Sequence, residues 1–150
     1  MSMQSAAGGW PGLEAASPLA RRRRVVVVDD DPGMNQAIRR LLDAAGFLVL
    51  TFSSGEALLK GKAATTADCM ILDVTLPGMS GFELQQRLKD SGVNTPFILV
   101  TAHDSSSVRE RAERAGAVAY LPKPFIGRTL LEKVCHALRP VAPHENGLGR

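Results

Sequence analysis

Short apolar segments alternate along the chain with segments whose apolar residues recur at helical spacing. Val25–Val28 is β-branched throughout, which is typical of a strand buried on both faces of a sheet. From Met34 onward apolar residues recur every three or four positions, which predicts a helix that ends at Gly46. The alternation occurs five times in all, and the other expected strands are 47–52, 70–72, 97–100 and 117–121, each followed by a helix.

Five strand–helix units with short connections predict an α/β fold. Crossovers between parallel strands are right-handed, so the helices cover both faces of a parallel sheet. We expect a doubly wound five-stranded sheet of the flavodoxin-like type with strand order 2-1-3-4-5. Pro77 and Gly78 predict a type II turn after the third strand. Serine followed by glutamate three residues later predicts capping boxes at three helix starts: Ser53 with Glu56, Ser80 with Glu83, and Ser107 with Glu110.

Charge and turn residues divide the chain into three parts. Residues 1–24, with Arg21–Arg24 at their end, are expected to be a disordered basic leader, residues 25–139 the folded domain, and residues 140–150 a linker or tail. The leader contains four arginines and one glutamate, whereas residues 25–150 contain 14 basic and 14 acidic side chains, so the net charge of +3 comes from the leader. The balanced domain lacks the basic face that nucleic-acid binding requires.

Cysteine usage and hydropathy bear on the compartment. Cys69 and Cys135 have no metal-type spacing, so buried free thiols in a reducing compartment are expected. No apolar segment is long enough to span a bilayer, and the arginines follow the mildly apolar leader, which is the wrong order for a signal peptide. These features favour a cytoplasmic protein with no membrane partner.

Polar side chains follow four of the five expected strands. Asp29 and Asp30 come after the first strand, Asp73 after the third, Thr101 after the fourth and Lys123 shortly after the fifth. The carboxyl ends of parallel strands lie at one edge of a sheet, where ligands of doubly wound folds bind. We therefore expect these five side chains to converge, with Asp73 at the mouth of its strand and solvated rather than buried.

Such a cluster predicts phosphoryl chemistry. Carboxylates at close range repel by about 4 kcal/mol per pair, so a bound cation is expected to relieve the repulsion. Oxygen ligands without histidine or cysteine favour Mg²⁺ or Mn²⁺. A divalent ion, the ammonium of Lys123 and the hydroxyl of Thr101 around a carboxylate suit the oxygens of a phosphoryl group, and Asp73 is the best-placed nucleophile.

The motifs around these residues resemble the receiver domain of two-component response regulators, over about residues 25–139. The matching segments are VVVVDDD at 25–31, ILDVTLPGMSG at 71–81, VTA at 100–102 and YLPKPF at 120–125. The segments FSS at 52–54, followed by Leu58 and Leu59, and LPGMSG at 76–81 resemble those of receivers that precede a helix-turn-helix effector. The resemblance implies a signalling domain that catalyses only its own phosphorylation and dephosphorylation.

The same resemblance implies the metal ligands and the phosphate donor. Asp73 would accept phosphate from a phosphohistidine on a sensor histidine kinase or a phosphotransfer protein. Asp30 would bind Mg²⁺ directly, Asp29 would act largely through water, and the backbone carbonyl of Thr75 would complete the protein ligands.

The resemblance also implies a switch. Lys123 would pair with the phosphoryl group, Thr101 would hydrogen-bond to it, and Tyr120 matches the aromatic residue that turns inward as the threonine moves. The Lys123–Pro124 bond is expected to be cis. The face formed by the helix after Ser107, strand 117–121 and the last helix would then bind an output partner or a second copy.

Two alternatives use the same residues differently. Asp29 and Asp31 are two residues apart, as in a haloacid-dehalogenase-type phosphohydrolase, but the late acidic pair of that family does not follow Lys123. Asp31 is better explained as a helix-start residue. A module that only binds a ligand leaves the clustered carboxylates unexplained.

Overall fold

A five-stranded parallel sheet forms the centre of the molecule. The computed structural model describes residues 22–139. The strand order is β2-β1-β3-β4-β5, so the predicted doubly wound α/β fold is confirmed. The strands are β1 (Arg24–Val28), β2 (Leu48–Phe52), β3 (Cys69–Asp73), β4 (Phe97–Thr101) and β5 (Ala119–Pro122).

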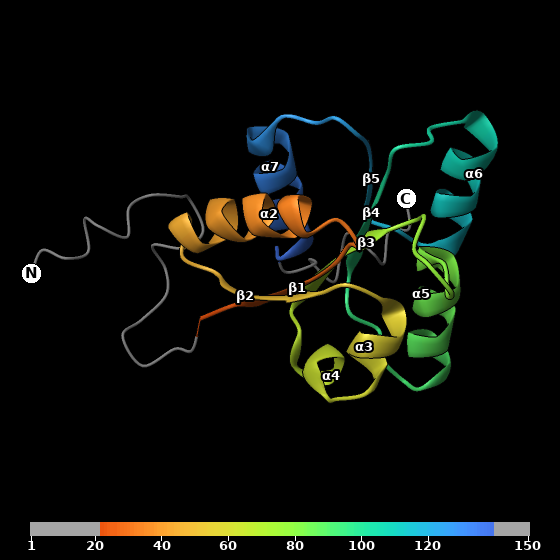
Figure 1. The fold of residues 1–150 in the computed structure, drawn as a ribbon, viewed down its shortest axis with the longest axis horizontal. Helices are drawn as coiled ribbons and strands as arrows, with labels where there is room; N and C mark the ends of the chain where they lie inside the picture. The colour runs from red at the N-terminus through yellow and green to blue at the C-terminus, as the bar shows by residue number, and fades with distance from the viewer. Residues whose placement is uncertain (1–21, 140–150) are drawn as a thin grey trace, which may run out of the picture.

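Helices cover both faces of the sheet (Figure 1). Helices α2 (Pro32–Ala44) and α7 (Gly127–Ala137) lie on one face, and the other four lie on the opposite face. Those four are α3 (Gly55–Leu59), α4 (Ala63–Thr66), α5 (Gly81–Asp90) and α6 (Ser106–Ala115). The short helix α4 was not predicted, because a single turn of AATT carries no apolar periodicity.

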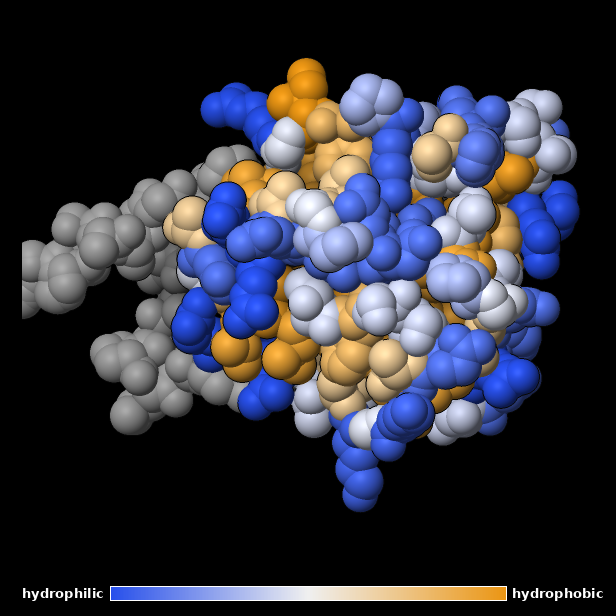
Figure 2. Space-filling view, viewed as in Figure 1, coloured by the Kyte–Doolittle hydropathy of each residue, from blue (hydrophilic) through white to orange (hydrophobic). Residues whose placement is uncertain are grey.

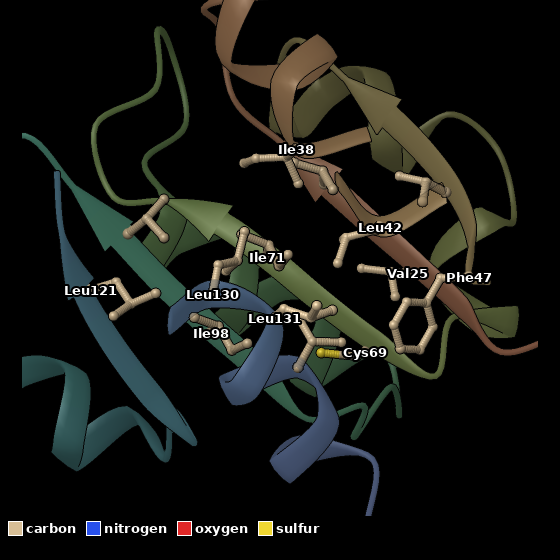
Figure 3. Packing of buried hydrophobic residues seen from close by; sticks show 14 residues of the cluster. Val25, Ile38, Leu42, Phe47, Cys69, Ile71, Ile98, Leu121, Leu130 and Leu131 are labelled. Carbon is tan, nitrogen blue, oxygen red and sulfur yellow. The ribbon is translucent and has the colours of Figure 1, made fainter. Parts of the chain in front are cut away.

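Two apolar clusters, one on each face, fix the sheet. In the first, Ile71 and Ile98 of the sheet face Leu130 and Leu131 of α7 (Figure 3). In the second, Leu72 of β3 packs in the cluster that α5 and α6 close. Hydrophilic residues cover most of the face seen in Figure 2, with smaller hydrophobic groups between them. The sheet is therefore held from both sides, and its carboxyl edge is positioned by the packing.

Neither Cys69 nor Cys135 forms a disulfide, as predicted, but only Cys69 is fully buried. Cys69 lies in β3 within the first cluster, and Cys135 of α7 packs against that cluster while half-buried. Burial raises the pKa of the Cys69 thiol to about 12, so this thiol stays protonated at neutral pH.

The helix starts confirm one predicted capping box and correct two. Ser80 accepts from the Glu83 amide and the Glu83 side chain accepts from the Ser80 amide, as expected. Helix α3 is capped by Ser54 rather than Ser53, and α6 by Ser105 rather than Ser107. Each of these serines lies in a run of serines with equivalent hydroxyls, so the helix register against the core decides which one caps.

The arginines before the first strand contact the fold. Arg22 donates to the carbonyls of Gly46 and Phe47, and Arg23 donates to the carbonyl of Leu138 at the end of α7. Strand β1 itself begins at Arg24, so the last part of the expected leader belongs to the described structure. The rest of that leader, residues 1–21, and residues 140–150 of the expected tail lie outside the described residues. Within 22–139, none of the helices has the length and apolar character needed to cross a bilayer.

Candidate phosphoacceptor site

Asp73 is the last residue of β3 and is buried. It pairs in register with Val100 of β4, and its side chain is covered, so the expectation of a solvated carboxylate is wrong. The protein supplies the missing solvation: the Thr75 amide donates to Oδ1 at 3.1 Å, and Lys123 Nζ donates to Oδ2 at 3.2 Å. The carboxylate is therefore held in a fixed direction at the sheet edge.

A glycine holds the backbone behind Asp73. The Gly81 amide donates to the Val74 carbonyl at 3.0 Å, and a Cβ at position 81 would collide with the Asp73 carbonyl oxygen. Only glycine allows this approach. The turn before it contains Gly78 at φ +75°, as the predicted type II turn requires. The turn and the start of α5 thus fix the position of the backbone at the end of β3.

The acidic loop after β1 brings a second buried carboxylate to Asp73. Asp29 Oδ1 accepts from the Asp31 amide at 2.9 Å, and Oδ2 accepts from Lys123 Nζ at 2.8 Å. Lys123 therefore bridges two buried acids. Asn35, which sequence reasoning missed, is buried in the first turn of α2 and donates to the Asp29 carbonyl at 2.8 Å. Its signal was a polar residue one turn before Ile38 on the buried face of the helix.

Three of the four acids form a candidate metal site. One carboxylate oxygen from each of Asp29, Asp30 and Asp73 lies within 4.8 Å of the others, and Asp30 is exposed. Asp31 lies outside this group and caps α2 by accepting from the Gly33 amide at 2.9 Å. The donors are all carboxylate oxygens, so they fit a hard divalent cation. The phosphohydrolase alternative, which needs Asp31 in the site, is not supported.

The charges in this site shift one another's pKa. Burial raises the pKa of Asp73, and the negative charge of Asp29 raises it further, while the Thr75 amide and Lys123 oppose both effects. Burial lowers the pKa of Lys123, but its bonds and charge attraction to Asp29 and Asp73 outweigh burial, and the net pKa is raised. Lys123 is therefore firmly charged, and the site carries an excess of negative charge.

Thr101 ends β4 next to this cluster. It directly follows Val100, the register partner of Asp73, and it is fully buried. Its hydroxyl accepts from the His103 amide at 2.9 Å, and its carbonyl accepts from the Lys123 amide at 2.7 Å. The Lys123–Pro124 peptide is cis, as expected. Strands β4 and β5 are thus tied together beside the lysine.

Tyr120 lies on β5, three residues before Lys123, and its hydroxyl reaches the surface. The half-buried ring packs against the second core cluster, and the hydroxyl donates to Asp104 Oδ1 at 2.8 Å. Arg109 of α6 binds the same carboxylate and lies over the ring, with Cζ 5.2 Å from its centroid. Asp104 and Arg109 were not predicted, because an exposed acid in a loop and a base on a charged helix have no distinctive spacing.

Comparison with known proteins agrees with this geometry. The profile of the response regulator receiver domain matches residues 25–135. Nodulation protein W of Bradyrhizobium diazoefficiens is 33% identical over 85% of this chain and 56% of its own length. The chain thus spans about half the length of this curated relative.

Solved structures agree in fold. A response regulator receiver protein from Burkholderia phymatum is 46% identical, with a TM-score of 0.70 over 81% of this chain and 99% of that one. The BeF3-activated receiver domain of DrrB, a Thermotoga maritima protein, is 31% identical, with a TM-score of 0.72 over 79% of this chain and 98% of that one. The family match covers the sheet and every strand end described above, and the chain belongs to the response regulator receiver domain family.

Proposed function

We propose that Asp73 accepts a phosphoryl group from a phosphohistidine of a sensor histidine kinase or a phosphotransfer protein. One observation carries the proposal: a buried carboxylate at the end of the central strand is bridged by Lys123 to a second buried acid, with a third acid in reach of a shared cation. Membership of the receiver family supports the same chemistry. The acyl phosphate forms as an Asp73 oxygen bonds to phosphorus and the bond from phosphorus to the histidine nitrogen breaks.

The chain's own residues prepare this transfer. Lys123 already bonds to Asp73 Oδ2, so its ammonium is placed to neutralise a phosphoryl oxygen beside that carboxylate. The Thr75 amide holds Oδ1 and so fixes the carboxylate plane. The Thr101 hydroxyl, on the residue after the register partner of Asp73, is proposed to donate to a second phosphoryl oxygen. These groups position and stabilise a phosphoryl group, and the domain would catalyse only its own phosphorylation and dephosphorylation.

A Mg²⁺ ion, or Mn²⁺ in its place, fits the acidic group. Asp29, Asp30 and Asp73, with the backbone carbonyl of Thr75, would hold it, Asp29 largely through water. When bound, the ion supplies positive charge that offsets the mutual repulsion of the acids and the charge of the incoming phosphoryl group.

The output of the phosphorylated state is proposed to be the face formed by α6, β5 and α7. Tyr120 lies on this face and is proposed as the aromatic switch that follows Thr101. The curated relatives are longer than this chain, so an effector, a separate output partner or a second copy of the domain is proposed to read the face. A histidine kinase donor implies a cytoplasmic site of action. We propose that the receiver extends to residue 139 and begins no later than Arg24, the first residue of β1, with the residues before it as leader and 140–150 as linker or tail.

The test is intact-mass measurement after incubation with acetyl phosphate and Mg²⁺. Wild type is expected to gain one phosphate-sized mass per chain, and Asp73→Asn is expected to gain none. The matched control is Asp31→Asn, because Asp31 lies in the same acidic run but outside the cluster and asparagine also caps helices. A chelator should prevent the gain. Equal labelling of wild type and Asp73→Asn would overturn the proposal, as would steady phosphate release from small phosphate esters.

A further inference from the structure

A second polar cluster, outside the phosphoacceptor site, joins three segments of the chain. Asp104 lies in the loop after β4, Arg109 in the first half of α6 and Tyr120 on β5. Arg109 Nη2 donates to both oxygens of Asp104 at 3.1 and 2.9 Å, and the Tyr120 hydroxyl donates to Oδ1 at 2.8 Å. The guanidinium also lies over the tyrosine ring. The hydroxyl and the ring of Tyr120 are therefore both engaged by groups at the surface.

The backbone from Thr101 to Asp104 links this cluster to the phosphoacceptor site. Asp104 is three residues after Thr101, and the amide between them, that of His103, donates to the Thr101 hydroxyl. The Thr101 carbonyl accepts from the amide of Lys123, three residues after Tyr120. A movement of the Thr101 hydroxyl toward a phosphoryl group on Asp73 therefore pulls on the loop that carries Asp104.

We infer that Asp104 and Arg109 are positioning residues that hold Tyr120 in its surface-bonded position and thereby set how readily the domain switches. This inference rests on the proposed function. In the bonded state Asp104 accepts the tyrosine hydroxyl; in the switched state the loop has moved and this bond is broken. A ligand shifts such an equilibrium only by its differential affinity for the two states. Removing the Asp104 bond destabilises only the bonded state, so phosphoryl mimics bind the variant more tightly.

A purely structural ion pair predicts something different. If the Asp104–Arg109 ion pair only fastens the loop to α6, its loss changes the free energy of unfolding. The affinity for a phosphoryl mimic and the position of Tyr120 then stay unchanged. The chain offers a direct reporter that separates these cases, because Tyr120 is its single tyrosine. Replacing tyrosine with 3-fluorotyrosine gives one ¹⁹F resonance, which reports the position of this ring alone.

The experiment compares wild type, Asp104→Ala, Asp104→Asn and the control Glu110→Gln, an exposed change on α6 outside these contacts. Without ligand, the ¹⁹F line of Asp104→Ala is expected to move from the wild-type position toward the position of beryllofluoride-bound wild type. Asp104→Asn, which keeps a neutral acceptor, should fall between them, and Glu110→Gln should match wild type. The beryllofluoride midpoint with Mg²⁺ should fall about two- to fivefold in Asp104→Ala.

Failures of the two proposals are distinguishable. A beryllofluoride-dependent change in wild type that is identical in Asp104→Ala, with identical lines before ligand, overturns the positioning role and leaves the proposed function intact. A wild type that shows no response to beryllofluoride and Mg²⁺ removes the proposed function and, with it, the switching role that rests on it.

Discussion

Two carboxylate–cation clusters of nearly equal geometry differ in almost every physical consequence. Lys123 and Asp29 are 2.8 Å apart, with 15% and 1% of their side chains exposed; Arg109 and Asp104 are 2.9 Å apart, with 54% and 38% exposed. Because the two contact distances are almost equal, they do not make one ion pair stronger than the other. Burial makes the Lys123–Asp29 pair the stronger one, because water is excluded from it but screens the Arg109–Asp104 pair.

The pKa shifts show the same contrast. The pKa of Asp104 is lowered, first by the hydroxyl of Tyr120 and then by Arg109, because it has partners and no competing acid. The pKa of Asp73 is raised, because burial and the charge of Asp29 outweigh Lys123. One cluster is therefore satisfied as it stands, and the other is short of positive charge. The following predictions test this difference, from the largest expected effect to the smallest.

Replacing the bridging lysine should have the largest effect on stability. Lys123→Met leaves Asp29 and Asp73 buried without their cation, and breaking a buried pair in this way costs about 3 kcal/mol of unfolding free energy at neutral pH. Urea unfolding measures the change. Lys133→Met, an exposed lysine on α7, is the control. Acid should restore much of the loss by protonating the carboxylates, and a variant as stable as its control would contradict the assigned burial.

Magnesium should stabilise the protein through an exposed carboxylate. Asp30→Asn is expected to leave the urea midpoint unchanged without metal, since Asp30 is exposed. With Mg²⁺ at 100 times its dissociation constant, wild type should gain about 2.7 kcal/mol. A tenfold weaker site in the variant would lower that gain by about 1.4 kcal/mol. Asp31→Asn should respond to Mg²⁺ as wild type does; if Asp30→Asn does too, Asp30 is not a ligand.

Neutralising Asp73 should stabilise the metal-free protein. Because the pKa of Asp73 is raised on folding, the native state binds this proton more tightly than the unfolded state. Its contribution to stability is present below the ordinary aspartate pKa and is lost as pH rises through the raised value. Asp73→Asn should therefore unfold like wild type in acid and be more stable than wild type at neutral pH. Urea titrations at several pH values measure this gap, and a gap that narrows toward neutral pH contradicts the sign.

Changes in the exposed cluster should be local. Burial, the hydrogen bond to Asp104 and the charge of Asp104 raise the pKa of Tyr120, in that order. Asp104→Asn should lower this pKa but leave it above the ordinary tyrosine value, because burial persists. Alkaline absorbance titration of the single tyrosine measures it, and added salt should shrink the difference. An unchanged pKa would mean that the bond to Asp104 does not form in solution.

Sequence patterns predicted the buried cluster better than the exposed one. Each apolar strand ends at the carboxyl edge of the sheet. Parallel pairing brings these strand ends together regardless of the sequence that connects them. Asp29, Asp73, Thr101 and Lys123 could therefore be placed from the sequence. Asp104, Arg109 and Tyr120 come together through a loop, a helix and a strand, and no period relates them. Their association depends on contacts that form only between these three segments in the folded domain, which no local pattern encodes.

The burial of Asp73 and the choice of two of the capping serines were also not predicted correctly from the sequence. Asp73 was expected to be solvated because it ends a strand, yet it is buried and bonded to the Thr75 amide and to Lys123, which is distant in sequence. The same limit applies to the helix caps, because the serines at 53–54 and 105–107 are chemically equivalent and the sequence alone does not tell which one caps. Ser54 and Ser105 cap helices whose Leu58 and Ala112 are buried.

The close approach of Gly81 to the Asp73 carbonyl also limits how the backbone around Asp73 can move. Gly81, the first residue of α5, approaches the Asp73 backbone with no side chain between them, and Leu84 and Leu88 hold that helix in the core. We therefore expect the start of α5 to move little when Asp73 is modified. The proposed switch would then act through β4 and β5, although α5 begins closer to Asp73 along the chain.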